Sequence, residues 1–182
     1  DNSIYQKAFS LSKRPISARL YATALGLYHA EINGKKAGDL LLTPYWTNYK
    51  SRIQYQTYDV TSLLTQGDNI LSGTVSEGWF KGRLAGWLQR AEVYGDTSAF
   101  LAELHITFAD GTREIIKTNA SWLWGKSQVT KSGFYYGEDY DARIIPNAEN
   151  PVKLLTYGYD KLIPQESDPV REIETIQPIE II

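Results

Sequence analysis

Acidic side chains gather in one short segment of the chain. Glu138, Asp139 and Asp141 fall within residues 137–141, and Glu77 stands directly before a Gly-Trp pair. Two carboxyl groups about 5 Å or about 6.5–9.5 Å apart can cleave a glycosidic bond between them. The same oxygens could instead ligate a hard cation such as calcium, or form a solvated acidic turn. Neighbouring residues of a strand point to opposite faces, so Glu138 and Asp139 converge only if they lie in a turn.

The sequence lacks the motifs of cysteine-dependent, serine-dependent and zinc-dependent catalysis. The chain has no cysteine, which excludes disulfides, zinc–thiolate sites, iron–sulfur clusters and cysteine nucleophiles. The two histidines, His29 and His105, fall on polar positions of expected strands. There is no Gly-x-Ser-x-Gly elbow and no His-Glu-x-x-His motif. The sequence therefore favours binding over a self-contained reaction, and an independent hydrolase stays as the lower alternative.

Two aromatic loops are the strongest candidates for binding. The chain has 13 Tyr and 5 Trp, and they are dense in residues 42–50 and 76–90. Tyr and Trp combine an apolar ring face with a polar group, which suits either a sandwich core or a platform for sugar rings. Long loops at the end of a sandwich commonly carry binding residues. We predict a sugar site where these loops meet, with these substrate-binding residues: Asn48, Tyr49, Trp79, Arg83 and Trp87.

The composition excludes some classes of partner. Lys plus Arg number 19 against 21 Asp plus Glu, for a formal net charge of −2. A nucleic-acid binder would carry a basic excess, and no apolar run reaches the about 20 residues of a membrane span. We therefore expect neither a nucleic-acid nor a membrane partner. The compartment is left open, with the cytoplasm slightly favoured over secretion.

Periodicity predicts an all-β fold in which strands position these loops. Apolar residues alternate over residues 28–32 and 100–108, the pattern of half-buried strands. Asn33-Gly34 and Asp110-Gly111 follow these runs and are typical hairpin turns. Residues 59–64 suggest a single helical turn, and no segment has a helical period over three turns. A β-sandwich or jelly roll is favoured.

The chain changes character near Asn147. Residues 166–182 carry five acidic side chains against Arg171 alone, a net charge of −4, and prolines space the segment. Such a stretch is typical of an extended linker or edge strand. We expect residues 1–146 to form the sandwich, and residues 147–182 to form a linker and exit strand toward a further domain.

Several motifs, in order, resemble one known family. The chain is similar over about residues 15–146 to the N-terminal domain of bacterial α-L-rhamnosidases, the family 78 glycoside hydrolases. The similar segments are residues 22–28, 31–35, 46–49, 53–61, 77–83, 94–96, 109–112 and 137–143.

The resemblance implies a galactose-binding-like jelly roll that precedes a catalytic (α/α) barrel. That family's general acid and base lie on the barrel, so the resemblance implies no catalytic residue in this chain. Some relatives bind L-rhamnose with calcium through the loop that matches residues 47–49. Here Asn48 replaces the usual Asp, and an amide oxygen brings no charge, so weaker calcium binding is expected. Asn48 and Glu138 are the candidate calcium ligands, and no cofactor is required.

Three functions stay open at this point. The first is an accessory domain that recognises or positions rhamnose-containing glycosides for an α-L-rhamnosidase. The second is a structural spacer packed on other domains of the same polypeptide, which would bury its aromatic residues and offer a flat apolar patch. The third is a self-sufficient glycoside hydrolase, which needs a facing carboxylate pair in a cleft.

Overall fold

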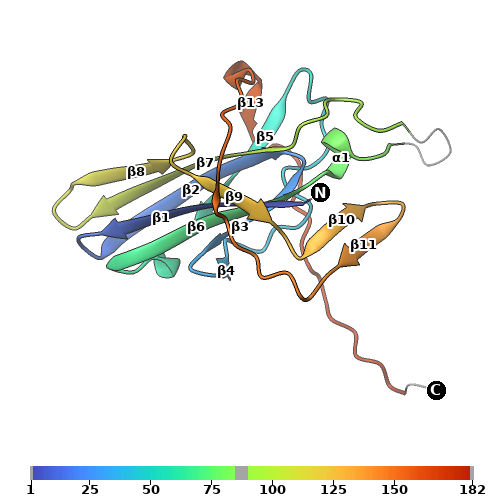
Figure 1. Cartoon of the computed structure of the whole chain (residues 1–182). Helices are drawn as coiled ribbons and strands as arrows, with labels where there is room; N and C mark the ends of the chain where they lie inside the picture. Colours follow the sequence, from blue (N-terminus) through green and yellow to red (C-terminus); the bar gives the residue numbers. More distant parts are fainter. Residues whose placement is uncertain (1, 85–89, 181–182) are drawn as a thin grey trace.

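The computed structural model describes residues 2–84 and 90–180, and these form a nearly all-β fold of packed sheets (Figure 1). One sheet has the order β12 (Asn150–Pro151), β9 (Leu123–Lys126), β1 (Ser3–Leu11), β6 (Gly67–Ser76), β3 (Leu27–Ile32) and β4 (Lys35–Lys36). The other has the order β13 (Leu162–Pro164), β5 (Ile53–Asp59), β2 (Pro15–Leu25), β7 (Ala99–Phe108) and β8 (Arg113–Lys117). The predicted all-β sandwich is confirmed.

Short elements complete the fold. A separate hairpin pairs β10 (Val129–Gly133) with β11 (Gly137–Tyr140) beside the end of the sandwich (Figure 1). One helical turn, α1 (Gly78–Lys81), interrupts the second predicted loop, and two 3-10 turns are η1 (Thr61–Leu63) and η2 (Tyr159–Lys161). The turn predicted over residues 59–64 is therefore present as η1.

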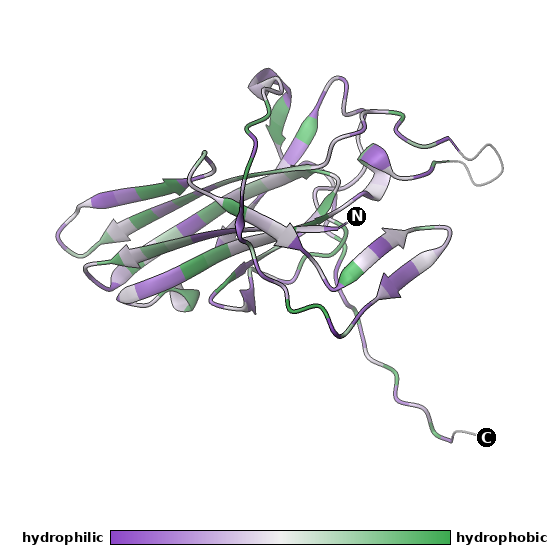
Figure 2. Ribbon diagram, viewed as in Figure 1, coloured by the Kyte–Doolittle hydropathy of each residue, from purple (hydrophilic) through white to green (hydrophobic). Residues whose placement is uncertain are grey.

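Alternating apolar residues build the core between the sheets. On β7, the side chains of Ala102, Leu104, Ile106 and Phe108 are buried, whereas Phe100 is partly buried and packs against the same cluster. Figure 2 shows hydrophobic and hydrophilic residues alternating along the long strands. A shift of one residue would turn this whole set to solvent, so the pattern fixes the register of β7 against its neighbours.

The two predicted hairpin turns adopt the expected backbone. Asn33 and Gly34 have φ angles of 54° and 73° and join β3 to β4. Gly111 has a φ of 81° in the turn between β7 and β8. Asn and Gly reach this left-handed region at low cost, so the local sequence specifies both turns.

Residues beyond Pro146 return to the sandwich. β12 pairs with β9 in the first sheet, and β13 pairs in parallel with β5 in the second. Ala148, which precedes β12, is buried. The segment expected to be a linker thus contributes strands to both sheets, and the chain runs away from the sheets only in its last part (Figure 1). A domain boundary at residue 146 stays a prediction.

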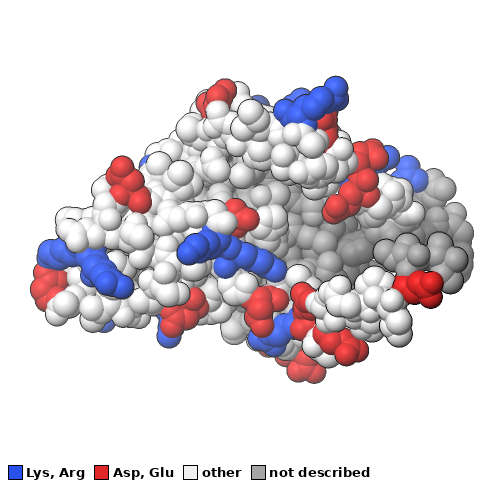
Figure 3. Space-filling view, turned by 90° about the horizontal axis from the view of Figure 1, so that it is seen from below, with Lys and Arg blue, Asp and Glu red and all other residues white. Residues whose placement is uncertain are grey.

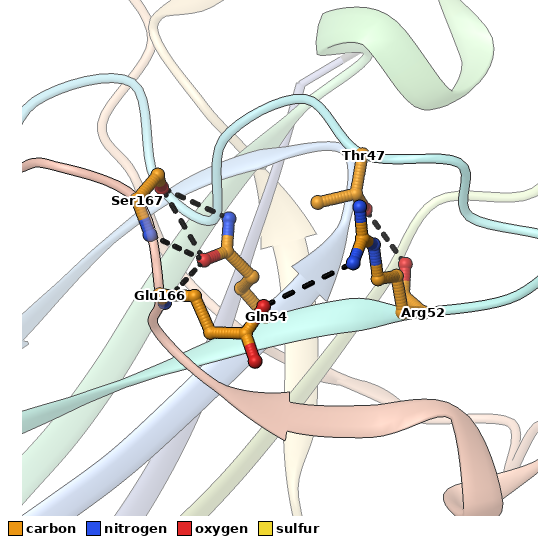
Figure 4. Close-up of polar contacts among 5 residues, drawn as sticks. All are labelled: Thr47, Arg52, Gln54, Glu166 and Ser167. Carbon is orange, nitrogen blue, oxygen red and sulfur yellow. Dashed lines mark hydrogen bonds and ion pairs between the residues drawn. The ribbon is translucent and has the colours of Figure 1, made fainter.

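A buried amide fastens this returning segment (Figure 4). The Oε1 atom of Gln54, on β5, accepts hydrogen bonds from the backbone N–H groups of Glu166 at 2.7 Å and Ser167 at 3.2 Å. Its Nε2 donates to the Ser167 hydroxyl at 3.1 Å. Arg52 Nη1 lies 3.9 Å from the Glu166 carboxylate. Residues 166–167 are therefore tied to the strand that follows the first aromatic loop.

A second set of bonds ties the first aromatic loop itself to this segment. The backbone N–H of Leu41 donates to the carbonyl of Val170 at 2.9 Å, and the Val170 N–H donates to the Tyr45 hydroxyl at 3.2 Å. Arg171 Nε donates to the Asp39 carboxylate at 2.7 Å. The conformation of residues 39–54 and the course of residues 166–171 are therefore coupled.

Replacing Leu104 with Ala should lower the free energy of unfolding by about 2–5 kcal/mol, because the side chain is fully buried and its loss leaves a cavity. Ile115→Ala on β8 is the matched control, since Ile115 is 54% exposed, and should change stability by less than about 0.5 kcal/mol. Urea unfolding measures both. A loss below about 1 kcal/mol for Leu104→Ala would show that the register of β7 is wrong.

Replacing Gln54 with Leu should loosen residues 166–167, because two backbone N–H groups lose their shared acceptor. We expect a loss of about 1–3 kcal/mol in stability and faster amide hydrogen exchange at Glu166 and Ser167, with β7 amides unchanged. Gln66→Leu, at an exposed position, is the control. Unchanged protection at residues 166–167 would contradict the assigned role of Gln54.

Candidate functional site

Three aromatic rings from separate segments meet at one end of the sandwich. The rings of Trp46, from the first loop, and Trp79, from α1, stack with centroids 6.2 Å apart and an interplanar angle of 8°. Phe134, between β10 and β11, lies 4.6 Å from Trp79 at 27°. Trp46 is 55% exposed and Phe134 is 46% exposed. We call these three residues the aromatic stack; it leaves large apolar ring surface open to solvent.

The stack rests on a small buried cluster of its own. The side chains of Leu25, Tyr49, Ile53 and Phe80 are buried together, with Trp79 and Tyr94 packed against them. The Tyr49 ring meets Phe80 at 5.5 Å and Tyr94 at 5.0 Å, both edge to face. Such geometry is favourable beyond the area it buries. The first loop and α1 therefore share one hydrophobic base beneath the exposed rings.

Tyr49 does not have the role expected from the sequence. Its side chain is fully buried, and its hydroxyl donates to the Tyr45 carbonyl at 2.8 Å. Burial, and then the neighbouring Tyr94, raise the pKa of Tyr49 well above its usual value, so the hydroxyl stays a neutral donor. In this structure Tyr49 holds the loop in place, and a sugar in solvent would not reach it.

A glycine allows α1 to carry Trp79 to this position. Gly78 begins α1 with a φ of 52°, a conformation that residues with a Cβ rarely adopt. A Cβ added there would lie 2.6 Å from Leu27 Cγ on β3. The close approach of α1 to the sheet, and hence the placement of the next residue, depends on glycine at this position.

Asn48 lies at the surface of the first loop, two residues after Trp46. Its Oδ1 accepts from the backbone N–H of Lys50 at 3.3 Å, and its Nδ2 donates to the Ser51 hydroxyl at 3.4 Å. Both bonds are long, and the side chain is exposed. The Oδ1 and Nδ2 atoms can therefore exchange these partners for the hydroxyls of a ligand.

Arg83 and Glu77 bracket α1 near the β10–β11 turn. The Tyr136 hydroxyl lies 3.2 Å from Glu77 Oε2 and 2.9 Å from the Ser132 carbonyl. Desolvation, and then Glu77, raise the pKa of Tyr136 above its usual value, whereas the positive charge of Arg83 acts in the opposite direction. Arg83 is exposed. Trp87, the remaining predicted site residue, lies outside the described residues.

The predicted calcium ligands do not form a recognisable metal site. The side-chain contacts of Asn48 stay within its own turn, whereas Glu138, on β11, lines a concavity to which Asn48 does not contribute. Within residues 2–84 and 90–180, no group of three or more His, Asp or Glu side chains could hold a metal ion. Asn48 and Glu138 therefore do not line one common concavity, and calcium binding at either residue stays a prediction.

Glu138, Asp139 and Asp141 do not show the arrangement of a catalytic acid–base pair. Glu138 and Asp139 occupy successive positions on β11 and so point to opposite faces. Asp141 forms a two-point ion pair with Arg143, at 2.8 Å and 2.7 Å, which lowers the pKa of Asp141. A catalytic acid of a glycosidase needs a raised pKa, so this shift has the wrong direction.

Two residues of the stack were not predicted as site residues. Trp46 lies in the loop identified from the sequence, two residues before the predicted Asn48. Phe134 begins the run Phe-Tyr-Tyr-Gly before the acidic turn. An aromatic run at a hairpin tip could have signalled an exposed surface, but only the folded chain brings that tip to α1.

The surface charge is mixed. Lys and Arg side chains are interspersed with Asp and Glu on the face in Figure 3, and no continuous basic surface forms there. No helix among the described residues has the length and apolar character needed to cross a membrane.

Comparison with known proteins identifies the family. The profile of the α-L-rhamnosidase N-terminal domain matches residues 13–174. An α-L-rhamnosidase of Streptomyces avermitilis is 39% identical over 165 residues, which are 87% of this chain and 16% of that protein. An Alteromonas sp. α-L-rhamnosidase is 34% identical over 192 residues, covering 94% of this chain and 20% of that protein.

Solved structures agree with this assignment. The native α-L-rhamnosidase of Aspergillus terreus superposes with a TM-score of 0.87 and 35% identity, over 95% of this chain and 21% of that chain. The Streptomyces avermitilis enzyme complexed with L-rhamnose superposes with a TM-score of 0.86 and 36% identity, over 93% of this chain and 17% of that chain. The chain thus spans about a fifth or less of these relatives. It belongs to the family of α-L-rhamnosidase N-terminal domains.

Proposed function

We propose that this domain recognises rhamnose-containing glycosides and positions them for an α-L-rhamnosidase of which it is part. The observation that carries the proposal is the exposed aromatic stack, in which Trp46 presents a solvent-facing indole supported by Trp79. A structural spacer would be expected to bury such rings.

The chemistry of the sugar matches this surface. Rhamnose is a deoxy sugar whose methyl group and C–H face are apolar, and an indole can cover such a face. The amide of Asn48 offers donors and an acceptor to vicinal hydroxyls, and Arg83 adds a charged donor beside α1. The crystal structure of the Streptomyces avermitilis relative in complex with L-rhamnose supports the choice of sugar.

The affinity for a single sugar should be low. L-Rhamnose has about eleven heavy atoms, and water competes for each of its hydroxyl groups. We expect a dissociation constant in the high-micromolar to millimolar range, about −4 to −6 kcal/mol.

A second candidate is a spacer that packs on other domains of the same polypeptide. Leu154 and Leu155 are 69% and 45% exposed, and Ile173 and Ile176 are 92% and 81% exposed. Exposed apolar side chains of this kind favour contact with another protein surface. Both functions can coexist, because none of these residues belongs to the stack.

Titration of L-rhamnose followed by NMR tests the proposal. The indole N–H of Trp46 and the side-chain amide of Asn48 should shift at millimolar sugar, and Trp46→Ala should weaken binding about tenfold or more. Tyr159→Ala removes an aromatic ring that is 67% exposed outside the stack and should leave binding unchanged. The titration is run with and without calcium, because Asn48 is a predicted calcium ligand.

Two outcomes of this titration would count against the proposal. Absence of any shift at millimolar L-rhamnose, with and without calcium, would leave the spacer function alone. Binding that survives both Trp46→Ala and Trp79→Ala unchanged would place the sugar away from the stack.

The purified domain should not hydrolyse an aryl α-L-rhamnoside, because Glu138 and Asp139 point to opposite faces of β11 and Asp141 is paired with Arg143. Hydrolysis of terminal α-L-rhamnosyl bonds would then be the work of the longer protein. Release of the aryl group above the rate in buffer, abolished by Glu138→Gln, would instead support a self-sufficient hydrolase.

A further inference from the structure

A concavity of about 1010 Å³ lies on the outer face of the first sheet. Outward-facing residues of the central strands form its floor, among them Gln6 on β1, Thr74 on β6 and His29 on β3. Residues of the β10–β11 hairpin and of the segment 40–42 also line it.

The concavity adjoins the aromatic stack. Phe134 belongs to both, because its ring packs on Trp79 and it also lines the concavity. Gly78, which lines the concavity too, directly precedes Trp79. A ligand that covers the stack can therefore extend past Phe134 onto the outer face of the sheet without leaving the protein surface.

The lining suits a neutral, polar ligand with apolar faces. The lining includes hydroxyl and amide side chains such as Thr74, Ser76 and Gln128, and also the half-exposed Leu41 and Leu42. Sugar rings combine hydroxyl edges with C–H faces, and such a mixture of donors, acceptors and apolar side chains can match both.

The charges in the concavity argue against an ionic ligand. Among the described residues that line the concavity, the acidic ones are Glu31 and Glu138 and the one Lys or Arg is Lys36. The fixed charges are therefore few and of both signs. Desolvation lowers the pKa of His29 and outweighs the opposing effect of Glu31, 3.6 Å away, so the imidazole is neutral near pH 7. An anionic ligand would need a cluster of cations, and a strongly cationic one would need more carboxylates.

The size of the concavity exceeds what one sugar needs. Sites for drug-sized ligands occupy about 300–1,000 Å³, and a deoxyhexose has only about eleven heavy atoms. A single rhamnose on the stack would leave the concavity open to water. Several linked sugars would occupy both surfaces at once.

We propose that the concavity is a subsite for the sugars that follow a terminal rhamnose, so that the domain recognises a neutral oligosaccharide chain rather than a monosaccharide. This inference rests on the proposed function of the aromatic stack. The terminal rhamnose lies on Trp46 and Trp79, the chain passes Phe134, and the next sugars lie over β6 and β3 beneath the β10–β11 hairpin.

The test compares L-rhamnose with a neutral trisaccharide that ends in α-L-rhamnose, by NMR titration of the wild-type chain. The trisaccharide should bind at least about tenfold more tightly and should shift the amides of Thr74, Ser76 and Gln128. L-Rhamnose should shift only residues of the stack and its surroundings.

A variant pair isolates the concavity. Thr74→Tyr fills it from an outward position on β6 and should remove the gain of the trisaccharide while leaving L-rhamnose binding unchanged. Ile70→Tyr is the matched control, because Ile70 is an outward, 47% exposed residue of the same strand that does not line the concavity. It should leave both affinities unchanged.

The outcomes separate this inference from the proposed function. Equal affinities for the two ligands on the wild-type chain, with no shift at Thr74, Ser76 or Gln128, would overturn the subsite and leave the stack as a monosaccharide site. Binding of neither ligand would overturn both. The wild-type shift pattern decides the question even if Thr74→Tyr fails to fold.

Discussion

The packing of Tyr49 against Phe80 and Tyr94 supports the whole surface on which function is proposed. Tyr49 lies in a loop without regular structure, Phe80 lies in a single helical turn, and Tyr94 lies in a further loop. None of these segments can hold its conformation through its own hydrogen bonds. Edge-to-face contacts at 5.5 Å and 5.0 Å join them into one buried cluster, and Trp46 and Trp79 extend from that cluster into solvent.

The same loop is fastened from the opposite side by the segment that leaves the sandwich. Gln54, Tyr45 and Leu41 bond to residues 166–170, so Trp46 lies between two anchored points. Side chains that are fixed before a ligand arrives lose less entropy on binding. A displacement of residues 166–171 by a neighbouring domain would act on the Trp46 loop through these bonds.

The sequence predicted strands and turns that depend on neighbouring residues. It did not predict strands that pair with partners far away in sequence. The period-two pattern of residues 100–108 and the turns at Asn33-Gly34 and Asp110-Gly111 depend on neighbouring residues, and the structure has them. Whether a tyrosine such as Tyr49 points inward cannot be read from an irregular loop, which has no period. The return of β12 and β13 to the sheets depends on contacts more than 25 residues apart in sequence, and a proline-spaced acidic segment gives no local sign of them. Phe134 was missed for the same reason.

A weak sugar platform is physically suited to a domain tethered to a larger enzyme. Joining a second binding surface to a catalytic site by a short connection gives an effective concentration in the millimolar range. A dissociation constant of the same order is then enough to hold a glycan near the site, while tighter binding would slow release of the product. An exposed ring face with a few adjustable polar groups provides this affinity without the ordering cost of a closed pocket. The open, mixed surface at the end of this sandwich therefore fits the proposed accessory role.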